Sequence, residues 1–179
     1  RESFQQLNSE EWTAAELQNP INENEPCLRG SLFKSLFSAI NNNVKKGYSS
    51  IKVFEAGNVF KKEKRGFAQS LHLSGITYHH EPNQTWSKKQ FTYDFFSIMA
   101  EILKLLQTLG MHNAEFKKAS FVSPFSDNVL DIFQGKEKIG VIGEIDLSVT
   151  EKLVKKQAYG FEIYPEKICI KVCKKRTPW

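Results

Sequence analysis

One carboxylate in a β-rich stretch has the residue type and the position that chemistry would need. The stretch reads YSSIKVFEAGNVFKKEK, residues 48–64, with Glu55 two residues before Gly57. Alternation along a strand places Glu55 on the face of Ile51 and Val53, the side that turns toward a core. A carboxylate removed from water needs a partner, so we expect Glu55 to meet backbone amides or a cation. Spacing alone leaves open whether this acid is catalytic, ligand-binding or structural.

The other candidate sites favour structural explanations. His79, His80 and Glu81 follow a strand, and adjacent histidines there point to opposite sides, so we expect a surface loop and no metal site. The run GVIGEI, residues 140–145, has the glycines of a phosphate loop but no Lys-Ser or Lys-Thr ending, and its glycines fall inside a strand. Close backbone packing or a bulge explains them. Asp94 suits the first turn of a helix, where a negative charge favours the dipole. The sequence assembles no specific Ser–His–Asp or Cys–His set.

Two helices stand out among the elements that must position these residues. Ser31 can cap a first helix with apolar residues at helical spacing, and Gly47 suits its left-handed end. The clearest helix covers residues 92–110, with one continuous apolar stripe and Gly110 as its terminator. Ser148 and Glu151 form a capping-box pattern for a short third helix to about residue 157.

Strand patterns lie between and after the helices. We expect strands at 51–60, 68–78, 114–121, 127–134, 138–145, 159–164 and 167–172. The connections KKEKRG and QGKEK are typical of hairpins. Helices interspersed with hairpin-joined strands predict an α+β domain, an antiparallel β-sheet covered by helices on one face.

Composition predicts an ordinary globular protein. The chain has 179 residues, 40% of them hydrophobic and 25% charged, and no apolar run nears the ~20 residues that cross a bilayer. The first residues show neither an initiator methionine nor a secretory signal, so we expect a piece of a longer, cytoplasmic chain with no membrane partner. Cys27, Cys169 and Cys173 lack a Cys-x-x-Cys spacing, which fits a reducing compartment.

The net charge of +5 is unevenly placed. Residues 1–28 hold Arg1 against six glutamates, a balance of −5, so the remainder carries +10. This positively charged remainder of the chain could bind nucleic acid. Its lysines, however, come as scattered pairs where turns or helix ends are expected, which favours a solvated surface.

Four segments, taken in order, resemble the beta subunit of bacterial phenylalanine–tRNA ligase. NPINENEPCLRGSLFKSLFSAINNN is similar to that family's Asn-Pro, Leu-Arg and Leu-rich helix segment, and IKVFEAGNVF to its Phe-Glu-x-Gly-x-Val-Phe strand. Trp86 with YDFFSIMAEILKLLQTLG matches its Trp … Asp-Phe-Phe … Leu-Gly helix, and IGVIGEIDLSV its Ile-Gly-x-Ile-Gly-Glu segment. Asp146-Leu147 replaces the family's His-Pro, and Gly30 replaces a threonine.

The resemblance implies a class II synthetase-like domain without an active site of its own. It divides the chain into an acidic segment (1–18), the synthetase-like domain (19–170) and a basic edge (171–179) leading to the next domain. In the family, the alpha subunit carries the active site, which uses ATP and Mg²⁺, and two alpha–beta pairs form a heterotetramer that handles tRNA. Active members place an arginine two residues before the glutamate matched by Glu55, where this chain has Val53. Their third motif ends in Glu-Arg, whereas Glu144 precedes Ile145.

The resemblance also implies residue roles. It makes the following residues subunit-interface candidates: Asn19, Pro20, Leu28, Arg29, Ser31, Phe33, Phe37 and Ile40. It makes a second set structural members of the family's motifs: Phe54, Glu55, Gly57, Trp86, Asp94, Phe95, Phe96, Gly143 and Glu144. No catalytic residue, metal ligand or bound cofactor is expected in the chain itself.

Two other functions remain open at this point. The basic body and the final KKRTPW run would suit a stand-alone tRNA-binding module, whose affinity should fall steeply with salt. A small-molecule-binding synthetase paralogue would instead be stabilised by ATP or phenylalanine.

Overall fold

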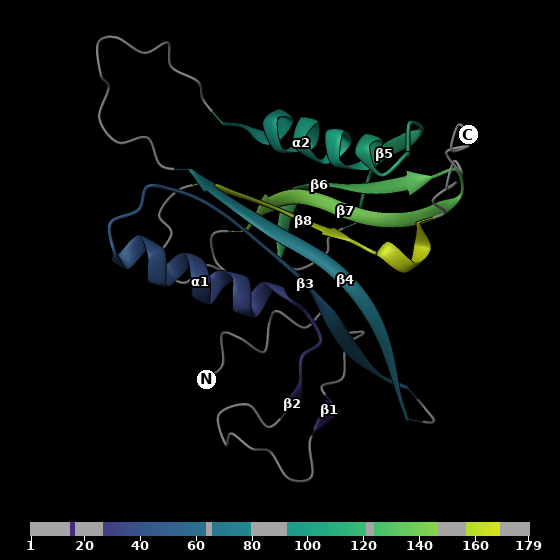
Figure 1. The fold of residues 1–179 in the computed structure, drawn as a ribbon, viewed down its shortest axis with the longest axis horizontal. Coiled ribbons are helices and arrows are strands. Elements are labelled where there is room, and N and C mark those ends of the chain that lie inside the picture. Colours follow the sequence, from purple (N-terminus) through teal and green to yellow (C-terminus); the bar gives the residue numbers. More distant parts are fainter. Residues whose placement is uncertain are drawn as a thin grey trace, which may run out of the picture.

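A six-stranded antiparallel sheet forms the body of the protein (Figure 1). The computed structural model describes residues 15–16, 27–63, 66–79, 93–120, 124–146 and 157–168. The sheet strands, in chain order, are β3 (Ser50–Glu63), β4 (Gly66–His79), β5 (Ala114–Lys118), β6 (Phe125–Gln134), β7 (Glu137–Ile145) and β8 (Ala158–Ile163). Two short strands, β1 (Ala15–Glu16) and β2 (Cys27–Leu28), pair separately, and a 3-10 turn (Pro165–Lys167) follows β8.

The order across the sheet is β3-β4-β8-β7-β6-β5. Two hairpins, β3–β4 and β6–β7, supply four of the strands, as their turn sequences predict. The last strand, β8, inserts between them and pairs antiparallel with both β4 and β7. This insertion joins the two halves of the sheet, so the expected α+β class with an antiparallel sheet is confirmed.

The two helices lie on opposite faces of the sheet, whereas the sequence pattern suggested one covered face (Figure 1). The first, α1 (Phe33–Lys45), contacts β3 and β4, and the second, α2 (Phe95–Thr108), contacts β7 and β8. Each helix has its own buried cluster. An apolar stripe identifies the buried side of a helix, but it does not say which face of a sheet receives it.

The local signals at the ends of the helices act largely as expected. Asp94 accepts a hydrogen bond from the Ser97 N–H at 2.9 Å, and Ser97 returns one to the Asp94 backbone, which makes a capping box. Gly47 (φ 88°) and Gly110 (φ 84°) take the left-handed conformation after α1 and α2. The start of α1 differs, because the capping position is Leu32, while Ser31 Oγ accepts from the Phe33 N–H at 3.2 Å.

Some strand boundaries and connections differ from the sequence pattern. Lys61 and Lys62 lie within β3, opposite Ala68 and Phe67, because the hairpin closes at the Glu63–Gly66 pair. The expected helix after Ser148 and the strand at 167–172 lie largely outside the described residues.

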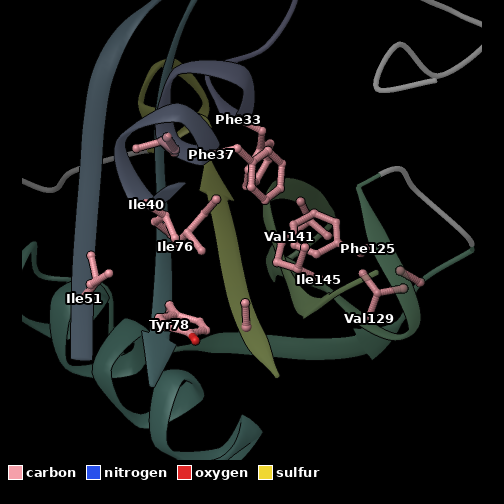
Figure 2. Close-up of a cluster of buried hydrophobic side chains, with 13 residues drawn as sticks. Phe33, Phe37, Ile40, Ile51, Ile76, Tyr78, Phe125, Val129, Val141 and Ile145 are labelled. Atoms are coloured by element: carbon pink, nitrogen blue, oxygen red, sulfur yellow. The ribbon is translucent and has the colours of Figure 1, made fainter. Parts of the chain in front are cut away.

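The α1 face holds an aromatic and aliphatic core (Figure 2). Phe33 meets Phe125 edge-on with ring centroids 5.4 Å apart, and Phe37 and Ile40 lie in the same cluster. Glycines on β7 and β8 make room, since a Cβ at Gly160 would lie 2.7 Å from Ile145 Cδ1 and one at Gly143 would lie 2.7 Å from Phe125 Cδ1. The glycines of GVIGEI are therefore packing residues within a strand, as expected.

Replacing Phe33 by alanine tests whether this side chain belongs to the core. Because only 2% of Phe33 is exposed, we expect Phe33→Ala to lower the free energy of unfolding of the isolated chain by about 3–5 kcal/mol. Phe96→Ala is the matched control, since Phe96 is 68% exposed and its loss should change that free energy by less than about 0.5 kcal/mol. Equal effects in urea unfolding would contradict the core assignment.

Candidate functional site

Glu55 is held by a cation and a hydroxyl, which identifies the partner that its strand position required. Arg29 Nη1 pairs with Glu55 Oε1, and Ser35 Oγ on α1 donates to Glu55 Oε2. The arginine and glutamate side chains are 44% and 30% exposed, so the pair lies at the rim of the sheet. Both carboxylate oxygens are occupied by protein groups, which makes Glu55 a structural acid in this structure.

Arg29 also caps the edge of the sheet. Its Nε donates to the Asn58 carbonyl at 2.8 Å, and its own carbonyl accepts from the Phe60 N–H at 2.9 Å. Both groups belong to the outer edge of β3, which has no neighbouring strand in the six-stranded sheet. One residue therefore satisfies edge groups of β3 and orders the segment that leads into α1.

Gly57 leaves the space that the Arg29 guanidinium occupies. A Cβ at Gly57 would overlap Arg29 Nη2 and lie 3.1 Å from Arg29 Cζ and 3.6 Å from Leu32 Cδ2. Two residues of the Phe-Glu-x-Gly pattern thus serve one purpose, because Glu55 binds the arginine and Gly57 lets it lie flat on the strand.

A second polar group continues from Glu55 across the same face. Ser74 pairs with Glu55 on β3 and with Glu162 on β8 in the strand register, and Ser74 Oγ donates to Glu162 Oε1 at 3.1 Å. His72 Nδ1 lies 3.0 Å from the same oxygen, and His72 Nε2 lies 3.1 Å from Ser70 Oγ. Ser74 is fully buried and His72 is 6% exposed, so this group is an internal network.

The structure thus brings together a Ser–His–Glu set that the sequence pattern did not reveal. The available signal was Ser70 and His72 at a spacing of two on a strand, but their acid, Glu162, lies 90 residues later. Hydrolysis would also need donors placed to bind an oxyanion. The nearby Leu71 N–H instead donates to the Glu166 carboxylate at 3.2 Å, which places negative charge beside Ser70. The arrangement therefore supports packing of β4 against β8.

Two tyrosines pack against polar groups, Tyr164 beside His72 and Tyr93 between α2 and the edge strand β3. The Tyr164 ring contacts the His72 ring at a tilt of 57°, with centroids 4.9 Å apart. Burial, followed by the charges of Glu162 and Asp131, raises the pKa of Tyr164. On the opposite face, Lys52 pairs with Glu101 of α2 and lies 4.6 Å from the Tyr93 ring centroid. Burial is the main cause that raises the pKa of Tyr93 to about 12.

The interface candidates divide between surface and core. Phe33, Phe37 and Ile40 are at most 5% exposed and pack within this chain, so their side chains present no surface to a partner. Leu28 and Ser31 are partly exposed and Arg29 is exposed. Asn19 and Pro20 lie outside the described residues.

The family-motif residues serve several structural purposes. Asp94 caps α2, Phe95 packs against the α2 cluster, and Glu144 accepts a hydrogen bond from Gln157 Nε2 at 2.8 Å. Phe54 and Phe96 are exposed, at 77% and 68%. Trp86 lies outside the described residues.

No metal cluster or membrane span is found in the described part of the chain. None of its His, Cys, Asp and Glu side chains gather in threes that could hold an ion. Neither α1 nor α2, the helices seen there, has the length and apolar content needed to cross a bilayer.

Solved structures with the same arrangement define the class of fold. Two structures of pyrrolysyl-tRNA synthetase from Desulfitobacterium hafniense match with TM-scores of 0.63 and 0.58. They cover 92% and 86% of this chain, and 54% and 50% of their own chains, at 14% and 16% sequence identity. This likeness shows a class II synthetase-like fold.

The family follows from the sequence comparisons. The family model described as the phenylalanyl-tRNA synthetase beta chain CLM domain matches residues 1–164, so the chain belongs to this family. A phenylalanine–tRNA ligase beta subunit of Wigglesworthia glossinidia brevipalpis is 32% identical over 81% of this chain and 19% of its own length. One from Thermotoga maritima is 28% identical over 82% of this chain and 18% of its own length. The chain thus spans about a fifth of the curated relatives it matches, and the resemblance seen in the sequence is confirmed.

A double-mutant cycle tests the Arg29 contact. Gly57→Ala displaces the guanidinium and Glu55→Gln removes its charge partner, so each change should cost about 0.5–1.5 kcal/mol of unfolding free energy for this half-exposed pair. Since both remove the same interaction, the double variant should cost less than the sum, measured by urea unfolding. Ala56→Ser, at an exposed neighbouring position, is the control. Strictly additive costs would show that Gly57 and Glu55 do not act through Arg29.

Alkaline pH tests the environment of Tyr93. Its pKa is raised above the unfolded value of 10, so the stabilising effect is complete below pH 10 and is lost as pH rises toward 12. We expect the urea midpoint to fall between pH 10 and 12, and to fall less steeply in Tyr93→Phe. An unchanged slope in that variant would contradict the assignment to Tyr93.

Proposed function

We propose that this chain is the non-catalytic, synthetase-like domain of a phenylalanine–tRNA ligase beta subunit. In this proposal it associates with the alpha subunit in the cytoplasm and helps to scaffold a heterotetramer of two alpha–beta pairs. The alpha subunit would use ATP and Mg²⁺ to attach phenylalanine to tRNA. The observation that carries the proposal is the engagement of Glu55 by Arg29 and Ser35 in a chain of this family.

The cations around Glu55 support a non-catalytic role. Activation of an amino acid by ATP needs positive groups placed against the triphosphate. The residue two before Glu55 is Val53, and the neighbouring Lys52 points to the other face, where it pairs with Glu101. Arg29 is the cation near Glu55 among the described contacts, and it binds the carboxylate and the β3 edge.

The segment that leads into α1 supplies the proposed contact with the alpha subunit. Leu28, Arg29 and Ser31 lie at or near the surface there, whereas the apolar side of α1 is already buried. The outer side of α1 carries Lys34, Ser38 and Asn42, all exposed. A stable subunit interface buries about 2,000 Å² or more, so it must extend beyond these residues to other parts of the longer protein.

Co-expression with the matching alpha subunit tests the proposal. We expect a stable complex whose mass in solution corresponds to a whole number of alpha–beta pairs. Ser31→Arg should weaken it at least tenfold, because a bulky charge would enter the contact. Gln107→Arg, an equal change at an exposed position of α2, should leave it intact.

Two results would count against this function. One is a complex that Ser31→Arg and Gln107→Arg affect alike. The other is a raised melting temperature of the isolated chain in ATP or phenylalanine, which would indicate a ligand site of its own.

A further inference from the structure

The two edges of the sheet differ in what covers them. The outer edge of β3 is bound by Arg29, whose carbonyl accepts from the Phe60 N–H and whose Nε donates to the Asn58 carbonyl. The opposite edge is β5 (Ala114–Lys118), which pairs with β6 alone among the described strands. An edge strand with unpaired backbone groups is a template on which another strand can add.

Alternate residues of β5 turn their backbone groups toward the open edge. The Ala119 N–H donates to the Val129 carbonyl at 3.2 Å, so these two residues form a hydrogen-bonded pair of the ladder. Bonded and non-bonded pairs alternate along an antiparallel ladder, and the β5–β6 register has no shift. The N–H and C=O groups that point away from β6 therefore belong to the following residues: Ala114, Phe116 and Lys118.

The side chains of β5 separate apolar from charged groups. Ala114 and Phe116 pack against the α2 cluster, so alternation places Glu115 and Lys117 on the other face of the sheet. Lys117 Nζ lies 3.0 Å from Glu115 Oε2 within the chain, and the two side chains are 54% and 60% exposed. Each ion therefore keeps open surface for a second partner.

The sequence of β5 is complementary to itself across a two-fold axis. When a second copy lies antiparallel with Phe116 opposite Phe116, Glu115 lies opposite Lys117 of the other copy, twice over. The outward-facing residues then form hydrogen-bonded pairs, and opposite charges directly across from each other are stabilising. An axis centred on Glu115, Lys117 or Lys118 would instead place like charges opposite each other, which is destabilising.

We propose that β5 pairs with β5 of a second copy of this chain and joins the two sheets into one. A two-fold contact must complement itself, and the charges of β5 do so in one register. A strand of five residues is about 17 Å long, whereas specific interfaces bury about 1,200–2,000 Å², so this pairing is one contact within a larger assembly. The inference rests on the proposed function, a heterotetramer of two alpha–beta pairs, and adds that its two beta chains touch through this edge.

Disulfide formation within the complete ligase tests the pairing. The alpha subunit is co-expressed with two full beta chains, one carrying Glu115→Cys and the other Lys117→Cys, and the oxidised ligase is mapped by peptide mass. Residues opposite each other in a non-hydrogen-bonded pair have Cα atoms about 4.5 Å apart, a distance that a disulfide spans. We expect a disulfide between these two positions at least tenfold more often than with Gln107→Cys in place of Lys117→Cys, since Gln107 is exposed on α2.

Charge reversal tests the register separately. Lys117→Glu places a carboxylate opposite Glu115 of the other copy at two sites, so association of the alpha–beta pairs should weaken at least tenfold. The mass of the ligase in solution should then shift toward a single pair, and Glu115→Lys/Lys117→Glu should restore it. Lys136→Glu makes the same change at an exposed turn position and should leave the mass unchanged. The urea midpoints of Lys117→Glu and Lys136→Glu should agree, because a folding defect is not the expected cause.

Several results would overturn the inference. One is a disulfide no more frequent than in the Gln107→Cys control, and another is unchanged association in Lys117→Glu or no recovery in the double reversal. A disulfide from the Glu115→Cys position to the alpha subunit, or to another part of the beta chain, would assign the edge to that partner instead. Failure of the wild-type alpha and beta chains to associate contradicts the proposed function, and the disulfide is then scored on the full beta chains alone.

Discussion

The edge of the sheet depends on the contacts that Arg29 makes with β3. Its guanidinium binds the Asn58 carbonyl and the Glu55 carboxylate, while its own carbonyl accepts from Phe60. Three groups of one strand are therefore joined to a residue in the segment that leads into α1. Helix, connecting segment and edge strand become one unit, and the absence of a side chain at Gly57 makes this geometry possible.

The same contact gives the acid of this synthetase-like sheet a structural partner. An acid on a sheet face could orient a substrate, but here Glu55 is neutralised by an arginine from its own chain. Polar side chains continue across this face from Glu55 through Ser74 to Glu162, whose carboxylate contacts His72. Buried polar groups linked in this way specify one arrangement of the strands, because any other register would leave them unpaired. This face stabilises the fold, while Phe54, on the other side of β3, is exposed.

Local signals in the sequence were enough to predict most helices and strands. They did not predict the contacts between residues far apart in the sequence. Gly47, Gly110 and Asp94 mark helix ends through backbone conformation or capping, which depends on neighbouring residues only. The partner of Glu55 lies 26 residues earlier and Glu162 lies 90 residues after His72, separations that no local pattern encodes. The apolar stripe of α1 fits a subunit interface as well as a core. Only the packing of Phe33 against Phe125 decides between them.

We propose that Glu55 acts in structure and not in catalysis. The most direct measurement is phenylalanine-dependent exchange between ATP and pyrophosphate by the complete ligase, with Glu55→Gln in the beta chain and the rate divided by the amount of assembled complex. We expect a rate per complex equal to that of the wild type, even if less complex forms. A rate per complex reduced by 100-fold or more, with assembly and stability intact, would contradict it and would place Glu55 in the reaction.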